Sequence, residues 1–529
     1  MIKRRKFIKK MGLSGLGIGA MIYWPGCNSP EVAEEATGVV DGLYSPESQG
    51  VSSQGLLNFF DAVAQSDLEF HSIMIKRNGN TILEAWWEPF EKEYVHTLYS
   101  LSKSFTSTAI GMLHDDGKLT VEDKVISFFP DKVPATVSEN LAAMRIYDLL
   151  TMHTGHTEDT MGPIRSASDG DWVKGFLALE VPEAPGTHFL YNTGATYMLS
   201  AIVQKVSGQK TLDFLQSRLM EPLGIVGADW EECPMGINVG GYGLRVRTQD
   251  ILNFGQLYLQ KGQWKGQQLL SSEWVEEATK KQVESQDNDS DWGQGYGYQF
   301  WRCKPIGGIY RGDGAYGQYC IVVPQKRTVI AITSETKDMA ASMQLVWDHI
   351  LPAIEYASDP IGEVSVGSVE ELADVTSQLK LPIDTVSMVN NLQQQLNGKT
   401  YEFVENDYGV QKVSFAFSRD HCEATFTQGD EIINVKSGLR QWLTSDKRKP
   451  GNSLFAIPGR TPMPTRISSH YHWPSKDVLV MKLKYVENLH HDIFTFTFIE
   501  NQLHLTFDNS LSYRSDEGDP RERVVAVLS

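Results

Sequence analysis

The fold is decided by one stretch in two parts, HSIMIKRNGNTILEAWW at residues 71–87 and YSLSKSFTSTAIGMLHDDG at residues 99–117. In the first part, two strand-like runs are joined by Asn78-Gly79, a pair that favours a two-residue type I′ hairpin turn. In the second part, Phe105, Ile110 and Leu113 form an apolar helical face, and Gly117 is a good residue to end a helix. The sequence therefore predicts a β-hairpin followed by a helix over residues 100–114.

The rest of the first 350 residues extends this pattern. Helical and loop patterns dominate from about Leu119 to Lys280, including residues 197–206 and 248–260. Strand character returns at residues 319–323 and 328–333, which Pro324-Gln325-Lys326 joins. A strand hairpin, then helices, then a second strand hairpin predict an α+β fold, with one antiparallel sheet flanked by helices.

The last third of the chain has a different pattern. A polar, irregular segment over about residues 360–381 precedes alternating runs at residues 413–417, 478–485, 493–499 and 503–507. Phe494, Phe496 and Phe498 alternate with threonines, which is typical of a half-buried strand. This region is predicted to be an all-β domain, a small barrel or a sandwich. The expected divisions are an export signal (1–27), a tether (28–50), the α+β domain (51–358), a linker (359–384) and the β-rich domain (385–529).

Composition excludes several classes of function. The 529 residues include 48 Lys and Arg against 66 Asp and Glu, a net charge of −18. Six of the basic residues lie in the first ten positions, so the other 42 against 66 acidic residues give −24. An acidic body repels phosphate backbones, and nucleic acid is not an expected partner. The five cysteines form no CxxC pair, so no metal or other cofactor is predicted, and pairing of Cys303 with Cys320 is left open.

The first 27 residues have the form of an export signal. The basic head MIKRRKFIKK precedes a short, glycine-rich apolar stretch. Arg4-Arg5 followed by Phe7-Ile8-Lys9 resembles a twin-arginine export motif, and Gly26-Cys27 resembles a lipoprotein cleavage site, although Trp24 stands where leucine is usual. The protein is expected in the cell envelope, either periplasmic or tethered to the membrane by a lipid on Cys27. The alternative is an uncleaved basic tail.

Ser100 and Lys103 are the first candidates for chemistry. A serine nucleophile needs a nearby base, and residues three apart lie on one face of a helix. The start of a helix also offers backbone N–H groups to an oxyanion. The same spacing occurs at Ser207, Ser334 and Ser377, but none of these opens an amphipathic helix directly after strand-like sequence. The alternative role of Ser100 is a helix N-cap.

Two further segments carry candidate groups. Tyr191 lies just before an amphipathic helix, where its phenolate or hydroxyl would relay a proton; the alternative is a core tyrosine. Residues 310–319, YRGDGAYGQY, form a glycine-rich entry into a strand, where a backbone N–H can approach a substrate closely. The alternative there is an ordinary turn.

In this order and spacing the segments resemble the serine hydrolases related to β-lactamases and penicillin-binding proteins, for which Ser-x-x-Lys is a motif. The resemblance covers residues 56–352 and includes LLTMHTG at 149–155, PGTHFLY at 185–191, GGYGL at 240–244 and GYGYQFW at 295–301. It implies Ser100 as the acylated nucleophile, Lys103 as its base and Tyr191 in proton transfer. The backbone N–H groups of Ser100 and Ala315 would form the oxyanion hole. The implied substrate pocket comprises Asn192, Thr193, Asp313, Gly314 and Trp301.

Two departures from that family bear on the substrate. Thr193 stands at the third position of the usual Tyr-x-Asn motif, where the family has Asn. Gly312 stands where a Lys or His helps to bind a substrate carboxylate. The form Gly314-x-x-Gly-Gln318 is more similar to the branch of 6-aminohexanoate-dimer hydrolases and carboxylesterases. The expected substrate is therefore a small or peptide-like amide or ester. The alternatives are β-lactamase or D-Ala-D-Ala carboxypeptidase activity, or an inactive envelope binding protein. The sequence does not indicate an oligomeric state.

The histidines are not predicted to bind metal. His153 and His156 form an HxxH, but a glycine lies between them and no acidic residue follows at helical spacing. His470, His472, His490 and His491 are expected in loops of the β-rich region, facing solvent.

Overall fold

The computed structural model describes residues 39–40, 43–355, 366–384, 392–449, 454, 463–511 and 519–529. The expected export signal, with its arginine pair and Cys27, lies outside the described residues. None of the described helices is both long enough and apolar enough to cross a membrane.

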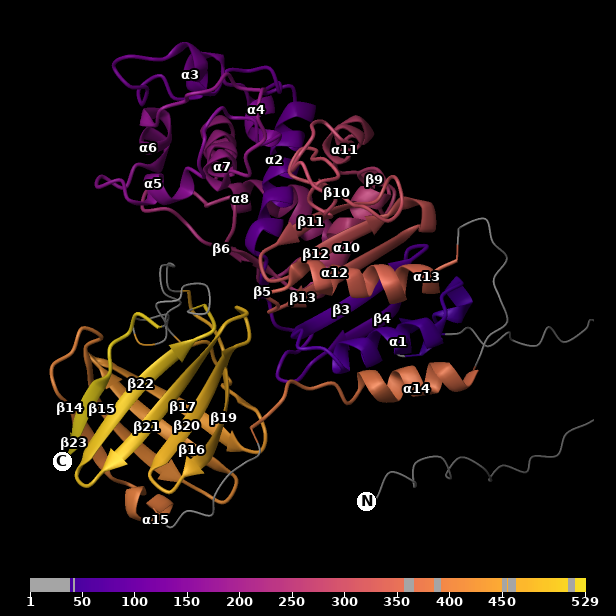
Figure 1. Ribbon diagram of the computed structural model, residues 1–529. Helices are drawn as coiled ribbons and strands as arrows, with labels where there is room; N and C mark the ends of the chain where they lie inside the picture. The colour runs from indigo at the N-terminus through magenta and orange to yellow at the C-terminus, as the bar shows by residue number, and fades with distance from the viewer. Residues whose placement is uncertain are drawn as a thin grey trace, which may run out of the picture. The chain divides into compact units, whose positions relative to one another are not determined.

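A six-stranded antiparallel sheet forms the centre of the first domain (Figure 1). The predicted hairpin over 71–87 is confirmed, and Asn78 and Gly79 have φ values of 53° and 84°, both positive as a type I′ turn requires. The second predicted hairpin is also confirmed, and β13 pairs with β3, which joins the two hairpins in one sheet. In sheet order the strands are β10 (Trp301–Arg302), β11 (Tyr310–Gly314), β12 (Gln318–Val323), β13 (Thr328–Ser334), β3 (Phe70–Arg77) and β4 (Asn80–Trp86).

Helices cover both faces of this sheet because the inner strands β12, β13 and β3 carry apolar side chains on both sides. On β3, Ile73 and Ile75 face one core and Met74 faces the other. The first core is closed by α1 (Ser53–Ala64), α12 (Met339–Leu345) and α13 (Leu351–Ala353), and the second by α2 (Ser102–Asp115) and α10 (Thr248–Leu259). Strands buried on both faces read as continuous apolar runs.

The remaining elements of this domain are short, apart from α7. The helices are α3 (Glu139–Ala143), α4 (Ile146–Leu150), α5 (Met161–Arg165), α6 (Trp172–Ala178), α7 (Thr193–Ser207), α8 (Thr211–Leu215), α9 (Glu221–Leu223) and α11 (Ser272–Thr279). The strands outside the main sheet are β1 (Val39–Val40), β2 (Leu43–Tyr44), β5 (His96–Thr97), β6 (Asp229–Trp230), β7 (Leu244–Val246), β8 (Gln263–Trp264) and β9 (Gln267–Gln268).

The expected irregular linker contains a helix, which corrects the sequence prediction. Helix α14 (Val366–Thr376) buries Leu372 in the core that α1 closes. The polar composition of this segment concealed it, because a helix that packs on one narrow stripe needs few apolar residues. After α14 the backbone pairs with the first domain, where Leu381 N donates to Glu88 O at 2.8 Å.

The C-terminal domain is a closed nine-stranded barrel, so the barrel alternative is the one observed. In barrel order the strands are β17 (Glu431–Leu439), β16 (His421–Gln428), β15 (Val410–Phe417), β14 (Thr400–Phe403), β23 (Val524–Leu528), β22 (Gln502–Asn509), β21 (His491–Ile499), β20 (Val478–Tyr485) and β19 (Ile467–Ser475). A parallel pairing of β17 with β19 closes the barrel. Phe494, Phe496 and Phe498 point inside, as their alternation predicts. Two short elements, α15 (Leu392–Leu396) and β18 (Leu443–Thr444), complete the domain.

Cys303 and Cys320 do not form a disulfide, since both are free thiols. The Cys303 sulfur accepts a hydrogen bond from Arg311 Nη1 at 3.3 Å. The Cys320 thiol donates to the carbonyl of Ile251 at 3.5 Å.

Candidate active site

Ser100 lies in a short turn that leads directly into α2. A 3-10 turn over Tyr99–Leu101 precedes the helix, and Tyr99 adopts a left-handed conformation with φ 48°. A non-glycine residue keeps that conformation only where its surroundings hold it there. Leu101, rather than Ser100, occupies the N-cap position of α2, and it makes no side-chain cap bond. The N-cap interpretation of Ser100 is therefore wrong.

Lys103 lies within hydrogen-bond distance of Ser100. Its Nζ is 3.0 Å from Ser100 Oγ and 2.9 Å from the carbonyl oxygen of Gly241. The side chain is 1% exposed, so these oxygens replace the water that an amine would otherwise bind. Ser100 lies in the 3-10 turn and Lys103 in the first turn of α2, and the continuous winding of the backbone through both brings the i, i+3 pair together.

The Gly240-Gly241 pair leaves space for this lysine. A Cβ on Gly241 would lie 2.7 Å from Thr193 Cγ2 and 3.6 Å from Lys103 Nζ. Any side chain there would press on Thr193, at the start of α7, and narrow the space around the amine. The carbonyl of Gly241 accepts the lysine hydrogen bond, so this turn is part of the site.

Tyr191 is brought to the same place from the segment before α7. Its ring centroid lies 4.8 Å from Lys103 Nζ, and its hydroxyl shares a hydrogen bond with Ser100. The ring stacks on Trp301, with centroids 5.4 Å apart. Burial raises the pKa of Tyr191, the negative charge of Asp313 raises it further, and the Ser100 hydrogen bond opposes them only in part. These shifts favour the neutral phenol over the phenolate.

Ala315 follows a point of very close backbone contact. A Cβ on Gly314 would lie only 2.1 Å from the carbonyl oxygen of Leu98, so β11 can approach the segment before Ser100 only with glycine there. Ala315 packs against the cluster formed by Tyr99, Tyr316 and Leu489. The two backbone segments that would supply the oxyanion hole are therefore neighbours.

Gly312 offers no charge to a substrate, and its neighbour Arg311 is bonded to groups inside the domain. A Cβ on Gly312 would lie 2.3 Å from Leu101 Cδ1 and 2.7 Å from Ser104 Oγ, so α2 occupies the space of a side chain. Arg311 is 0% exposed, and its Nε donates to Asp313 Oδ2 at 3.0 Å. Its Nη1 donates to the carbonyls of Asp291 and Arg302 at 3.3 and 3.2 Å. These bonds hold the guanidinium inside the domain.

The other expected pocket residues have different positions. Asn192 is 0% exposed and caps α7. Its Oδ1 accepts hydrogen bonds from Gly194 N at 3.1 Å and from Thr160 Oγ1 at 2.7 Å, so the side chain stabilises the start of α7. Thr193 begins α7 and touches the Gly241 turn. Asp313 accepts from Trp292 Nε1 at 3.0 Å as well as from Arg311. Burial raises the pKa of Asp313, and Arg311 opposes this shift.

The barrel domain reaches the residue next to Ser100, a feature that the sequence did not indicate. Tyr99 Oη lies 2.5 Å from Nε2 of His490, in the turn between β20 and β21. His490 Nδ1 lies 2.8 Å from Glu335 Oε1. A carboxylate only accepts, so Nδ1 carries the proton and Nε2 accepts from Tyr99. Tyr316 packs edge-on against both Tyr99 and His490, at 5.4 and 4.8 Å between ring centroids.

The expectation that four barrel histidines lie in loops holds only for His490, and the expectation that they face solvent is wrong for the fully buried His470 and His490. His470 and His472 are on β19, His490 lies in the β20–β21 turn, and His491 begins β21. His470 and His490 are each 0% exposed. Alternation along β19 places His470 and His472 on the outer face of the barrel. Other segments of the chain bury this face, and the spacing of residues in the sequence does not predict that burial.

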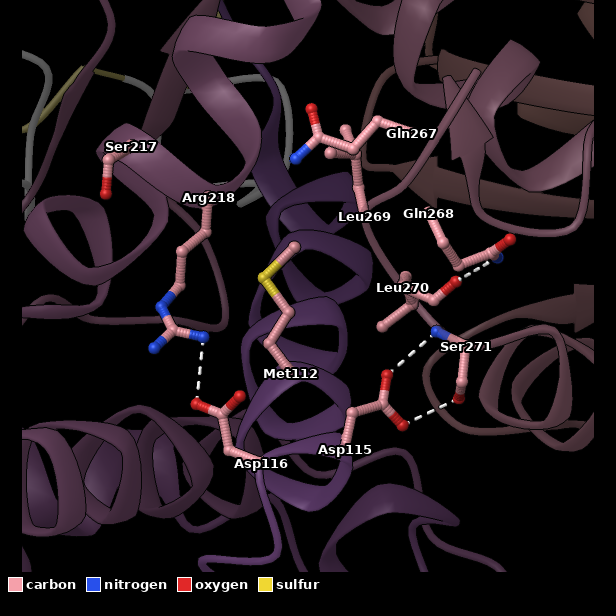
Figure 2. A pocket seen from close by; sticks show the side chains of 10 residues that line it. All are labelled: Met112, Asp115, Asp116, Ser217, Arg218, Gln267, Gln268, Leu269, Leu270 and Ser271. Carbon is pink, nitrogen blue, oxygen red and sulfur yellow. Dashed lines mark hydrogen bonds and ion pairs between the residues drawn. The ribbon is translucent and has the colours of Figure 1, made fainter. Parts of the chain in front are cut away.

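A separate cavity of about 560 Å³ lies near the opposite end of α2 (Figure 2). Met112 from α2 points into it, and an ion pair of 2.9 Å between Arg218 and Asp116 bounds one side. On the other side, Asp115 accepts from the backbone N and the hydroxyl of Ser271 at 2.8 and 2.6 Å. At a rise of about 1.5 Å per residue, Met112 is roughly 18 Å along the helix from Ser100. This cavity is therefore not part of the serine site.

The antiparallel sheet with helices on both faces, and a Ser-x-x-Lys pair at the start of its central helix, define a β-lactamase- or transpeptidase-like α+β protein. Its family is established by sequence: the model of the Beta-lactamase family matches residues 61–354, more than half of the chain, and the chain belongs to that family.

Several named proteins are similar to this chain. The 6-aminohexanoate-dimer hydrolase of Paenarthrobacter ureafaciens is 23% identical over 290 residues, which are 50% of this chain and 73% of the relative. A provisionally named D-alanyl-D-alanine carboxypeptidase of Escherichia coli (strain K12) is 24% identical over 209 residues, 34% of this chain and only 48% of the relative. The octameric penicillin-binding protein homologue of Pyrococcus abyssi has a TM-score of 0.47 at 15% identity, covering 89% of this chain and 99% of its own.

Proposed function

We propose that this protein is a serine hydrolase that cleaves an amide or an ester through an acyl-enzyme on Ser100. The observation that carries the proposal is the 3.0 Å contact between Lys103 Nζ and Ser100 Oγ at a buried site. A nucleophile and a base in direct contact, with a third group nearby, are the arrangement that activates a weak nucleophile.

Acylation begins with neutral Lys103. Nζ takes the hydroxyl proton of Ser100 as Oγ attacks the substrate carbonyl carbon, and the carbonyl oxygen gains the negative charge. The backbone N–H groups of Ser100 and Ala315 stabilise that oxyanion. The bond to the leaving amine or alcohol then breaks, and Tyr191 Oη donates its proton to the leaving atom. Lys103 returns the proton it took from Ser100 to Tyr191.

Deacylation reverses these roles with water. Tyr191 Oη takes a proton from the attacking water and passes its own proton to Lys103 Nζ. The ester bond to Ser100 Oγ breaks, and Lys103 returns the proton to Ser100 as the acid product leaves. The raised pKa of Tyr191 supports this scheme, because a neutral phenol can donate where a phenolate cannot.

The proposed substrate is neutral or cationic. Gly312 supplies no cation, Arg311 is paired with Asp313 and bonded to backbone carbonyls, and the body of the protein is acidic. A charge-assisted hydrogen bond contributes about 1.5–3 kcal/mol, so a substrate that depends on its carboxylate loses roughly 10- to 150-fold here. The hydrolase name of the Paenarthrobacter relative is consistent with cleavage of an amide.

Labelling with a fluorophosphonate probe tests the nucleophile. The purified protein should be labelled, and the Ser100→Ala variant should not; Ser377→Ala, in the same spacing motif, is the matched control. Equal labelling of Ser100→Ala would refute the proposal. Absence of labelling and turnover in the folded wild-type protein would favour an inactive binding protein.

A substrate screen tests the specificity. Short-chain p-nitrophenyl esters and ω-amino acid amides should be cleaved, and nitrocefin or D-Ala-D-Ala peptides should be poor substrates. If nitrocefin is cleaved as fast as the best ester, the β-lactamase alternative is correct and the inference from Gly312 is wrong.

We also propose export by the twin-arginine route and lipidation at Cys27, because the basic head, the arginine pair and the Gly26-Cys27 junction occur together. The double variant Arg4→Lys/Arg5→Lys should stay in the cytoplasm, and its continued export would contradict the route. Cys27→Ala should release soluble periplasmic protein, and unchanged membrane partition would contradict lipidation.

A further inference from the structure

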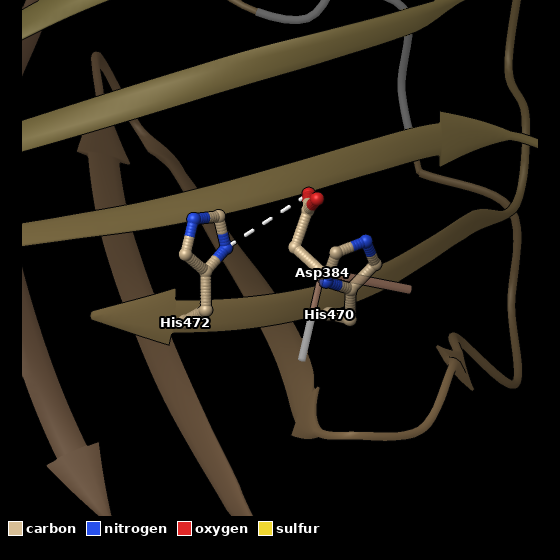
Figure 3. Close-up of side chains that lie close together, drawn as sticks. All are labelled: Asp384, His470 and His472. Atoms are coloured by element: carbon tan, nitrogen blue, oxygen red, sulfur yellow. Dashed lines mark ion pairs between the residues drawn. The ribbon is translucent and has the colours of Figure 1, made fainter. Parts of the chain in front are cut away.

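Three side chains on the outer surface of the barrel converge from two segments of the chain (Figure 3). His470 and His472 lie two residues apart on β19, so they share one face of the strand. The residues between and after them, Tyr471 and Trp473, point into the barrel core. Asp384, from the end of the linker, completes the group, and its Oδ2 lies 4.0 Å from His472 Nδ1.

His470 is a buried polar group without a hydrogen-bond partner among the described residues. The residue is 0% exposed, and neither Nδ1 nor Nε2 makes a hydrogen bond. The indole of Trp442 lies edge-on to the imidazole, with centroids 4.5 Å apart, and this contact fixes the ring. A buried imidazole loses the hydrogen bonds of water, and folded proteins replace them almost everywhere. Two ring nitrogens without hydrogen bonds, beside a carboxylate, therefore indicate a ligand-binding site.

The donor set identifies the class of that ligand. One donor atom from each of Asp384, His470 and His472 lies within 4.8 Å of the other two. Two imidazole nitrogens and one carboxylate oxygen are ligands that zinc accepts at about 2.0–2.2 Å, which places donors about 3.3 Å apart in a tetrahedron. The donor atoms, which now lie within 4.8 Å of one another, must therefore move closer by up to about 1.5 Å to bind zinc. The Asp384 side chain is 62% exposed and has room to rotate. Its exposure also leaves a fourth position for water.

A second histidine–carboxylate group provides an internal comparison. Glu69, His71 and Glu335 also lie close enough to hold an ion. There the Lys484 ammonium donates to both carboxylates, and His71 Nε2 lies 2.9 Å from Glu69 Oε1. The ammonium of Lys484 thus already lies between the two carboxylates of that group. At Asp384 no ammonium lies within ion-pair distance among the described residues, although Lys482 lies opposite His470 on β20.

We propose that Asp384, His470 and His472 bind a divalent transition-metal cation of the zinc type. The bound ion would tie the end of the linker to β19. The linker is already held on its other side, where Leu381 N donates to Glu88 O at 2.8 Å and Trp442 Nε1 donates to Leu381 O at 3.4 Å. The ion therefore joins a segment anchored to the first domain with the wall of the barrel. This site is independent of the proposed hydrolase activity.

Titration of the full-length, chelator-treated protein with zinc chloride, followed by calorimetry, tests the site. One equivalent should bind, and His472→Gln and Asp384→Asn should each weaken binding by at least tenfold, since even indirect partners of a metal change affinity 10- to 100-fold. Both changes lie at the barrel surface, so they preserve the fold better than replacement of buried His470. Lys482→Met should tighten binding, because it removes a nearby positive charge.

A matched control and a spectroscopic measurement make the result decisive. Asp420 and His421, 2.8 Å apart at the barrel surface, form a comparable pair, and Asp420→Asn should leave zinc affinity unchanged. Cobalt bound at the site should give visible d–d bands without a sulfur charge-transfer band. Wild-type affinity in both His472→Gln and Asp384→Asn, or a sulfur band, would overturn the proposal.

Discussion

Removal of the His490 side chain from the barrel should slow the chemical step at Ser100, more than 380 positions away in the sequence. The Tyr99 hydroxyl is hydrogen-bonded to His490 Nε2 at 2.5 Å, and Tyr99 directly precedes the nucleophile with φ 48°. His490→Ala removes one hydrogen bond from the hydroxyl of an 8%-exposed tyrosine. A hydrogen bond of this kind contributes about 0.5–1.5 kcal/mol. If Tyr99 shifts in response, the active geometry loses that amount of stabilisation, and kcat falls by roughly 2- to 13-fold.

The assay measures kcat and KM for the best ester of the screen. His490 is a positioning residue, so kcat should fall while KM for a small ester changes little, and His490→Gln, which keeps a donor and an acceptor, should recover part of the loss. Tyr99→Phe removes the hydroxyl that bonds His490. The double variant Tyr99→Phe/His490→Ala should therefore have a higher kcat than His490→Ala alone. His504→Ala, on the outer side of β22, is the matched control. If His490→Ala stays folded and its kcat is within twofold of that control, the barrel does not position the nucleophile.

Three other outcomes are expected. Lys103→Ala should lower kcat/KM by a factor of order 10² or more with unchanged circular dichroism, and unchanged turnover would remove the lysine from the mechanism. Gly314→Ala, whose Cβ would meet a backbone carbonyl at 2.1 Å, should lower the melting temperature and activity, while Gly307→Ala, with open space around it, should not. Burial lowers the pKa of His71 to about 4, and burial of Glu69 is outweighed by Lys484 and His71, which lower its pKa to about 2. Both groups take up protons more readily when unfolded, so stability is full above pH 6.5 and should fall as the pH drops from 6.5 toward 4 (His71) and from 4.5 toward 2 (Glu69); equal chemical-denaturation midpoints at pH 7 and 5 would contradict this.

Local patterns predicted much of the first domain. Asn78-Gly79 specified its turn, because both residues tolerate positive φ and few other pairs do. Ser-x-x-Lys specified its own contact for a similar reason, since the pitch of a helix alone brings positions three apart together. The helix boundary was less certain, and α2 begins at Ser102 rather than Ser100. A 3-10 turn and a helical turn have nearly the same sequence preferences.

Some contacts around the candidate site could not be predicted from the sequence because the partners are distant. Asn192, expected in the substrate pocket, is a buried cap of α7 that accepts a hydrogen bond from Thr160, the residue before α5. Arg311 lies one residue from the position that would need a cation, yet strand alternation and Asp313 turn it into the interior. Spacing in the sequence gives the side of a strand, but it does not tell which side faces the substrate.

The sequence by itself determined the two hairpins, the alternation of the barrel strands and the approach of Lys103 to Ser100, because each depends on residues close together in the chain. Only the tertiary structure decided the closure of the barrel by β17 and β19, the contact of His490 with Tyr99 and the meeting of Asp384 with His470 and His472. These contacts join residues dozens to hundreds of positions apart. Their partners are selected by the packing of whole domains, which no local periodicity encodes.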